Sequence, residues 1–441
     1  MNIVYRRIII TVFSIFFLIT APLVVLYTAG YRLNLQNFKL IPTGNLYLEG
    51  DDVTNASVII NDEVYDDVMN KKLYVKNLLP GNYTVTLTKD EYHTWTKKVE
   101  VREKLTTFIQ DITLFAKATP TQLIATGDPQ TLITTTSDFA VIARKSNEIT
   151  QYLLVSHDTL EETLIYKSTQ DHTPRITLSP KAKYALFVIQ NQSLLIDLKT
   201  TQVTTLPLDY DWKWNLHDDE LITLSKQSVV SYDINSGKMI TLLESPDSIT
   251  DVVAYNSTLY YITTSPQGSI LKSFQRTLKT TTTISTLLTS TQLRITHITP
   301  DFIIIHNNNA KTYTVISLTE NTDALASTTH TLYADRLVPS PNNKLLALMR
   351  GSEINIFDTT TNATTFVERL GTIAHHVTWY DNTHLIIAKD ADIVAMDLRV
   401  HNNLTSAHLA QTKKEISSLF VMNETLYFES DSIIYTFPLT Y

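Results

Sequence analysis

A unit of about 40 residues recurs through the C-terminal three quarters of the chain. Ser179-Pro180 and Ser340-Pro341 lie 161 residues apart, and Asp197 and Asp358 show the same separation. Two landmarks with one offset indicate the same unit in the same register, and four units of about 40 residues fill that offset. This period is typical of propeller blades with four strands each. The repeat therefore predicts a β-propeller.

The stretch from Thr177 to Leu208 shows how one unit is built. We expect a short strand, the turn at Ser179-Pro180, two apolar strands and a last strand. The apolar second strand can be counted eight times, at residues 139–143, 184–189, 220–224, 259–262, 302–305, 345–349, 384–388 and 426–428. Residues 116–441 are thus expected to form an eight-bladed propeller, or a seven-bladed one if the irregular unit at residues 248–288 is not a blade.

Two further features bear on how the units end. An aspartate closes the third strand of four units, where its carboxylate can accept N–H groups of the coming turn: Asp197, Asp233, Asp358 and Asp397. The last unit has no outer strand of its own, and residues 121–126, which precede the first unit, have the right length to supply it. Such a pairing would close the ring and protect its edges.

The Ser-Pro turns and the residues that follow them resemble the WD40-like repeats of the TolB type. The likeness lies in Lys183-Tyr184-Ala185, Lys344-Leu345-Leu346-Ala347 and the strand ends Ile196-Asp197 and Phe357-Asp358. The usual Asp-Gly after Ser-Pro is replaced by Lys181-Ala182 in one copy and by Asn342-Asn343 in the other. The resemblance implies a rigid interaction surface with ligands at the central channel or the loop faces, although a fold alone does not fix a function.

An uncharged apolar run from Ile8 to Tyr27 stands near the N-terminus, directly after Arg6 and Arg7. It is long enough to cross a hydrocarbon core of about 30 Å. Positive charge beside the first span stays on the cytoplasmic side, and Tyr27 fits the outer interfacial belt. We expect residues 1–31 to be a cytoplasmic stub and a single-pass anchor in the cell membrane, with the bulk extracytoplasmic. The alternative is a cleaved signal peptide, whose apolar region is usually only about 7–15 residues.

Residues 32–115 carry short alternating stretches separated by Asn, Asp and Gly, which predict a small all-β domain. Residues 56–62, 79–85, 92–95 and 98–101 resemble a PEGA domain, a small β-sandwich module found mostly on exported bacterial envelope proteins. The tetrapeptide that names the family has changed to Val53-Thr54-Asn55-Ala56. The resemblance implies an envelope location and an interaction role, with surface polymers as partners, and no chemistry. The whole chain is therefore expected to be all-β apart from its anchor.

Tyr92 and Trp95 are candidate ligand contacts, because with His93 they could form a sugar-stacking platform. The alternative is a structural role. Neighbouring strand residues such as Tyr92 and His93 point to opposite faces, and Trp95 would then close the small core.

Composition excludes several classes of function. The net charge of −8 gives no reason to expect nucleic-acid binding, which needs clustered Lys and Arg to displace phosphate counterions. The absence of cysteine excludes disulfides, thiolate metal sites and cysteine nucleophiles. The chain has no nucleophile-elbow, zinc-protease or phosphate-loop motif.

Three polar clusters are candidate sites, and we prefer a structural role for each. They are the histidines His375, His376 and His384 as metal ligands, the run His217, Asp218, Asp219 and Glu220 as an acid–base cluster, and Asp51, Asp52, Asp62, Glu63, Asp66 and Asp67 as a calcium site. Adjacent histidines of a strand point to opposite faces, and the acids lack the spacing and the glycine of a calcium loop. We therefore expect no catalytic, cofactor or metal site.

The sequence favours a membrane-anchored, extracytoplasmic binding or scaffold protein rather than an enzyme. Its expected partners are the lipid bilayer and an envelope protein or surface polysaccharide, with no nucleic acid. The alternatives are a propeller enzyme that acts on cell-envelope glycans, whose acids would come from separate blades, and a subunit of an envelope assembly complex.

Overall fold

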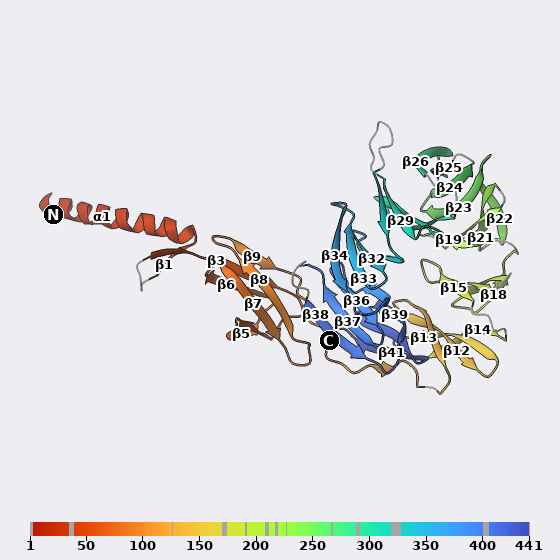
Figure 1. The fold of residues 1–441 in the computed structure, drawn as a ribbon, viewed down its shortest axis with the longest axis horizontal. Coiled ribbons are helices and arrows are strands. Elements are labelled where there is room, and N and C mark those ends of the chain that lie inside the picture. Colours follow the sequence, from red (N-terminus) through yellow and green to blue (C-terminus); the bar gives the residue numbers. More distant parts are fainter. Residues whose placement is uncertain are drawn as a thin grey trace.

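The computed structural model describes residues 3–34, 39–125, 127–169, 174–189, 192–207, 211–216, 219–225, 227–265, 268–287, 292–318, 328–399 and 405–440. Within these ranges the chain has one helix, α1 (Ile3–Thr28), followed by a hairpin of β1 (Tyr31–Asn34) and β2 (Lys39–Pro42) and then by further strands. Figure 1 shows three consecutive parts: the helix, a small pair of sheets, and a large ring of sheets.

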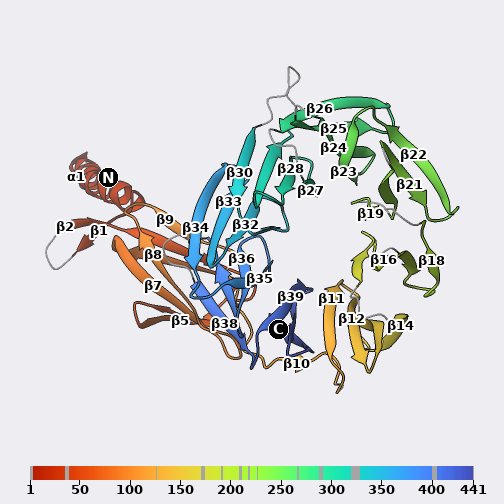
Figure 2. The ribbon, with the colours of Figure 1, turned by 45° about the vertical axis from the view of Figure 1, so that its right-hand side comes forward.

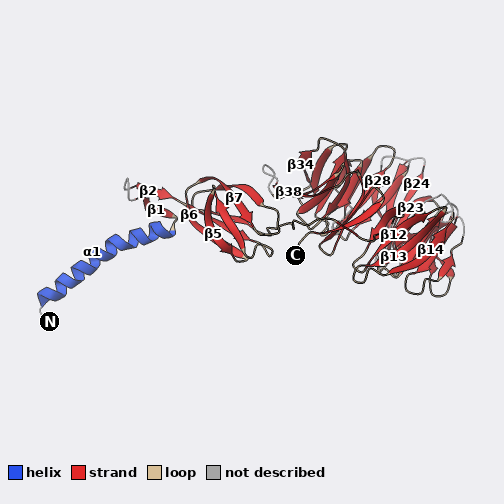
Figure 3. Ribbon diagram, turned by 90° about the horizontal axis from the view of Figure 1, so that it is seen from below, coloured by secondary structure: helices blue, strands red, loops and turns tan. Residues whose placement is uncertain are grey.

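Helix α1 is long and apolar enough to cross a membrane, by length and composition. Its apolar span, Tyr5–Thr28, has 24 residues and is 0% buried against the rest of the protein. Arg6 and Arg7 are exposed at one end and Tyr27 is exposed at the other, while the side chain of Ile8 lies outside the described part. Figure 3 shows the helix extending away from both β parts, so its apolar surface has no partner within them.

Residues 44–114 form what we call the two-sheet module. One sheet has the order β6 (Lys72–Leu78), β3 (Gly44–Glu49), β9 (Thr106–Ile109), and the other has the order β5 (Glu63–Met69), β4 (Ala56–Ile60), β7 (Gly81–Thr88), β8 (Trp95–Val101). The described pairings are antiparallel except for that of β3 with β9. Strand β8 alternates strictly between buried and exposed positions, because successive side chains point to opposite faces. Leu46, Val58, Val85 and Trp95, from both sheets, share one core.

The described residues between 121 and 438 form eight four-stranded sheets, and Figure 2 shows them following one another around a ring, as in a β-propeller. In chain order the sheets are β11 (Gln130–Thr135), β12 (Phe139–Ser146), β13 (Ile149–Ser156), β14 (Glu162–Ser168); β15 (Arg175–Leu178), β16 (Tyr184–Ile189), β17 (Gln192–Asp197), β18 (Val203–Thr205); β19 (Lys213–Trp214), β20 (Leu221–Ser225), β21 (Ser228–Asp233), β22 (Lys238–Glu244); β23 (Ser248–Tyr255), β24 (Thr258–Ser265), β25 (Gly268–Gln275), β26 (Thr280–Leu287); β27 (Leu293–Ile298), β28 (Phe302–Asn307), β29 (Thr312–Ser317), β30 (Thr329–Tyr333); β31 (Arg336–Pro339), β32 (Leu345–Arg350), β33 (Glu353–Asp358), β34 (Ala363–Arg369); β35 (Ala374–Trp379), β36 (His384–Lys389), β37 (Asp392–Asp397), β38 (Thr405–Gln411); and β39 (Ile416–Met422), β40 (Thr425–Ser430), β41 (Ile433–Pro438) with β10 (Thr121–Gln122). The unit at residues 248–288, which the sequence presents as irregular, thus forms a complete sheet over Ser248–Leu287.

The core of the ring lies between neighbouring sheets. One cluster joins Val141 and Tyr152 of the first sheet to Phe187 and Ile196 of the next. The second and third strands of each sheet are therefore covered on both faces, which explains why they read as continuous apolar runs rather than alternating ones. Outer strands such as β18 and β22 are largely exposed.

The predicted pairing that closes the ring is present. Thr121 and Gln122 of β10 pair with Thr436 and Tyr435 of β41, and the Thr121 and Thr436 hydroxyls lie 2.9 Å apart. A strand from the start of the ring thereby completes the last sheet and covers the edge of β41.

The aspartates that end third strands hold their turns as predicted. Asp197 accepts the N–H of Lys199 at 2.9 Å and that of Thr200 at 2.8 Å. Asp233 and Asp358 bond the N–H groups two and three residues ahead in the same way. These carboxylates satisfy donors that the turn would otherwise leave to solvent.

The Ser-Pro turns place two residues in the left-handed backbone region. Ala182 has φ +50° and Asn343 has φ +59°, at the positions where the related repeats carry glycine. The hydroxyls of Ser179 and Ser340, both buried, accept N–H groups of the strands that follow and fix these turns. Alanine pays a steric penalty in this region, whereas asparagine tolerates it better.

We expect Ala182→Gly to raise the free energy of unfolding by about 0.5–1 kcal/mol, because glycine removes the Cβ strain at only a modest entropic cost. Asn343→Gly is the matched control, and it should destabilise, because Asn343 Oδ1 lies 2.9 Å from His297 Nε2 and glycine deletes that bond. Chemical denaturation of both variants measures the difference. Destabilisation by Ala182→Gly would contradict the assignment of strain.

Candidate functional site at the junction of the two-sheet module and the ring

A short segment after the module joins it to the ring through the backbone. Tyr92 and Ala116 form a β-bridge, and the N–H of His93 donates to the carbonyl of Phe115 at 2.8 Å. The N–H of Ala116 donates in turn to the carbonyl of Leu439 in the last sheet, also at 2.8 Å. Ala116, at the boundary between the two parts, is therefore a buried residue that is bonded to both of them.

A buried ion pair fixes the same junction through side chains. Lys97 of β8 and Asp397 of β37 are 300 residues apart in sequence, yet Lys97 Nζ lies 3.2 Å from Asp397 Oδ2, and each side chain is only 2% exposed. Arg399 donates to both carboxylate oxygens of Asp397, at 2.8 Å and 2.7 Å. The remaining guanidinium nitrogen of Arg399 donates to the carbonyls of Gln110 and Asp111 in the module. The ring thus binds the module through charged side chains whose hydrogen bonds are directional.

The carboxylate of this cluster is stabilised by the cations around it. Burial opposes the charged form of Asp397, but the Arg399 guanidinium, the Lys97 ammonium and the nearby His384 ring outweigh it and hold the pKa of Asp397 well below its usual value. Burial lowers the pKa of Lys97, and Asp397 counteracts that effect. A buried pair of this kind is sensitive to the loss of either partner, since the other charge is then left uncompensated.

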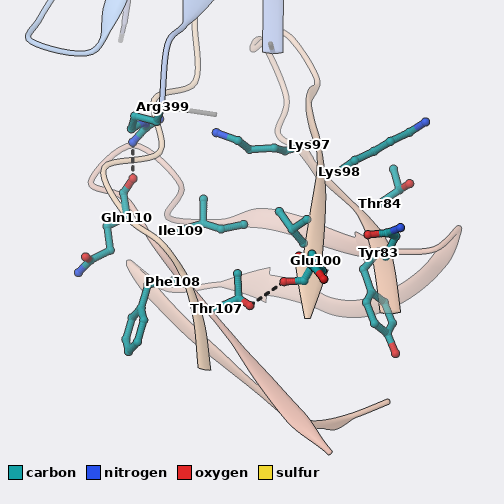
Figure 4. A pocket seen from close by; sticks show the side chains of 12 residues that line it. Tyr83, Thr84, Lys97, Lys98, Glu100, Thr107, Phe108, Ile109, Gln110 and Arg399 are labelled. Carbon is teal, nitrogen blue, oxygen red and sulfur yellow. Dashed lines mark hydrogen bonds between the residues drawn. The ribbon is translucent and has the colours of Figure 1, made fainter. Parts of the chain in front are cut away.

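Beside the ion pair opens a pocket of about 680 Å³ between strands of the module and the ring loop that carries Arg399. Figure 4 shows Arg399 bonded to the backbone of Gln110 on one wall, and Lys97 and Lys98 on another. Its lining includes Tyr83, Thr84, Lys98, Glu100, Thr107, Phe108 and Gln110. Amide, hydroxyl, ammonium and aromatic groups together suit a polar ligand with hydroxyl groups.

On another side of the junction lies a second opening of about 990 Å³, which we call the acidic cleft. Its acids come from both parts: Glu49, Asp51, Asp52 and Asp111 from the module, and Asp381 and Glu424 from the ring. Burial and the neighbouring carboxylate of Glu424 raise the pKa of Asp52. Burial raises the pKa of Tyr380 in the same cleft to about 12, with Glu424 and Asp52 adding to the effect.

The candidate ligand contacts predicted from sequence do not face solvent. Tyr92 and Trp95 are 5% and 4% exposed and belong to the core of the module. Their rings are therefore not available to stack on a ligand, which agrees with the structural alternative. Strand β8 buries every second residue, and Trp95 falls on the inner positions.

The described members of the three polar clusters are held by other partners or lie apart. His384 is buried, with Nδ1 2.8 Å from Asp381 and Nε2 4.0 Å from Asp397, so it supports the junction. Glu220 is bonded bidentately by Arg276, while His217, Asp218 and the side chains of His375 and Asp67 lie outside the described part. Asp51 and Asp52 line the acidic cleft, which Asp62, Glu63 and Asp66 do not. Among the described residues no three His, Asp or Glu are placed to hold a metal ion.

The sequence reasoning missed three aromatic residues that the structure brings together. Tyr47, Tyr74 and Phe108 lie side by side on the outer face of the β6-β3-β9 sheet, with ring centroids 6.4 Å apart for Tyr47 and Tyr74 and 5.5 Å apart for Tyr47 and Phe108. Each stands next to a more buried aliphatic residue of the same strand, such as Leu46, Leu73 or Ile109. The alternation along each strand could be read from the sequence, but the pairing of β3 with β9 could not.

No family model matches the sequence, and no curated protein matches it. Among solved structures, Saccharomyces cerevisiae Sqt1 is similar over 74% of this chain and 99% of that chain, at 9% identity and a TM-score of 0.49. The Dos1 propeller is similar over 70% and 95%, at 12% identity and a TM-score of 0.46. An oligogalacturonate lyase from Vibrio parahaemolyticus is similar over 65% and 92%, at 11% identity and a TM-score of 0.39. These likenesses assign no function to the chain.

We expect Asp397→Asn to lower the free energy of unfolding by about 3 kcal/mol at neutral pH, because Lys97 and Arg399 lose their buried counter-charge. Asp233→Asn is the matched control: the same strand-end position, but away from the module, so its loss should be about 1 kcal/mol or less. Because the folded-state pKa of Asp397 is depressed, its contribution is present above the ordinary aspartate pKa of about 3.9 and fades as pH falls below it.

Denaturation curves of wild type and variant should therefore converge in acid. Equal losses for the two variants at neutral pH, or a gap that widens in acid, would contradict the role given to Asp397.

Proposed function

We propose that this protein is a membrane-anchored scaffold that holds a propeller outside the cytoplasm in a fixed orientation and presents it to envelope partners. The observation that carries the proposal is the junction. An exposed apolar helix leads into the two-sheet module, and the module is tied to the ring by the buried Lys97–Asp397–Arg399 cluster. A chain built only to tether a mobile domain needs no buried charge between its parts.

Orientation follows from the residues that flank α1. Arg6 and Arg7 at its N-terminal end favour retention of that end in the cytoplasm, and Tyr27 near the other end suits the outer interface. The PEGA-like residues 56–62, 79–85, 92–95 and 98–101 support an envelope location for the module. Each of the eight four-stranded sheets is then one blade, with β10 completing the last of them.

The absence of cysteine allows a direct test of topology. We expect a cysteine introduced at the exposed residue Lys413 of the ring to react with a membrane-impermeant maleimide on cells stripped of outer barriers. Asn2→Cys, on the other side of the proposed span, should react only after lysis. The reverse pattern, or protection of both cysteines until lysis, would contradict the proposal.

A second candidate function is hydrolysis of envelope glycans in the acidic cleft. The observation that favours it is the convergence of Asp52 and Glu424, from the two parts of the chain, with the pKa of Asp52 raised by burial and by Glu424. Two carboxyl groups in one cleft, with the pKa of one of them raised, are the kind of pair that general-acid cleavage of a glycosidic bond uses.

If this second function holds, Asp52→Asn should abolish release of reducing sugar from a susceptible polysaccharide. Asp62→Asn, on an exposed residue of the same module that does not line the cleft, should leave it unchanged. Equal activity in the two variants would remove Asp52 from the reaction.

A further inference from the structure

The outer face of the β6-β3-β9 sheet is organised in rungs that cross the three strands. Register places Tyr47 opposite Tyr74 on one side and Phe108 on the other, which gives an aromatic rung. Tyr74 is 42% exposed and Phe108 62% exposed, although large apolar rings are normally buried. Nothing in the core of the module requires these rings, since the core lies on the opposite face of the sheet.

The next rung toward the ring is polar and internally neutral. Glu49 is paired with Lys72 at 2.8 Å and accepts a hydrogen bond from Gln110 at 3.0 Å. On the other side of the aromatic rung, Asn45 and Thr106 lie within 3.5 Å of one another and Tyr74 reaches the same hydroxyl. The aromatic strip is therefore bordered by amide, hydroxyl, carboxylate and ammonium groups, and Lys76 Nζ lies 5.4 Å from the centroid of the Tyr74 ring.

This face is continuous with both openings at the junction. Phe108 and Gln110 also line the pocket of about 680 Å³, and Glu49 and Lys72 also line the acidic cleft. An extended polymer that crosses the rungs would thus run from the exposed aromatic strip into one of these two openings. Aromatic strips with a few placed polar groups are typical of ligand-binding surfaces.

We infer that the outer face of β6-β3-β9 binds a neutral polysaccharide, whose sugar rings pack on Tyr74, Tyr47 and Phe108 while its hydroxyl groups bond the polar rungs. Charges of both signs lie along the face, since Glu49 pairs with Lys72 and Lys76 Nζ lies over the Tyr74 ring, and the adjoining acidic cleft repels polyanions such as nucleic acid. An apolar protein surface or a bilayer core would take the flanking carboxylate and amide groups out of water, which is costly even for groups that bond one another. A polyhydroxylated ligand satisfies both kinds of group.

This inference deepens the proposed function by naming a class of partner. It rests on the proposed function only for the side of the membrane on which the protein meets the glycan. Binding is measured on the purified full-length chain in detergent, so failure to bind leaves the topology test untouched, and a reversed topology leaves binding untouched.

Affinity electrophoresis in native gels containing soluble neutral polysaccharides (hydroxyethylcellulose, xylan, galactomannan or dextran) tests the inference. At least one of them should retard the wild-type chain, and Tyr74→Ala with Phe108→Ala should raise the dissociation constant about tenfold or more. Phe366→Ala, which removes an exposed ring from β34, is the matched control and should behave like wild type. Tyr74→Phe with Phe108→Tyr keeps both rings and should retain binding.

Retardation by none of the four polysaccharides, or by anionic polygalacturonate alone, would overturn the inference. So would equal retardation of the double alanine variant and wild type, because a different surface would then carry the binding. Thermal unfolding of each variant is the control that checks whether the exposed substitutions leave the fold intact.

Discussion

The carboxylate of Asp397 is the point on which the arrangement of the molecule depends. It lies in the ring, it is almost fully buried, and it receives one cation from the module and one from its own loop. Taking such charges out of water is costly, and the cost is offset only when every partner is in place. The cluster therefore favours one docking of the module on the ring over others that would leave a buried charge unpaired.

One short segment carries the effect of this docking into the ring. Residues 115–117 are bonded to the module at His93 and Glu91 and to the last sheet at Leu439. A few residues later the same segment becomes β10, which pairs with β41 and completes that sheet. Docking of the module and closure of the ring are thus made by consecutive residues, so a disturbance at one is expected to reach the other. The two-sheet module is in this sense part of the proposed scaffold rather than an appended domain.

Much of the fold was readable from the sequence because its signals are local. Apolar runs such as 184–189 and 345–349 predicted buried strands, Asp197 and Asp358 predicted the turns, and the missing outer strand of the last unit predicted the role of Thr121. The junction was not readable. Lys97 looks like an ordinary strand lysine and Asp397 like one more turn aspartate, and only the folded chain brings these two residues together.

The aromatic residues show the same limit. Tyr92 and Trp95 attracted attention as neighbours in sequence, yet they are buried, whereas Tyr47, Tyr74 and Phe108 are scattered in sequence and meet on one face. Period-two alternation tells which residues of one strand share a face. It does not tell which strands are neighbours, and the parallel pairing of β3 with β9 had no signal in the sequence. A binding surface that spans several strands can therefore be identified only when the register of the strands is known.

We expect the module and the ring to move as one body, and the distribution of distances between them shows whether they do. Because the chain has no cysteine, spin labels can be attached at Glu63→Cys in the module and Lys238→Cys in the ring, both exposed positions. Pulsed electron–electron double resonance on the full-length protein should give a single narrow distance distribution that broadens when Asp397→Asn is added. A distribution that is already broad in the otherwise unaltered protein would mean that the module and the ring do not move as one body.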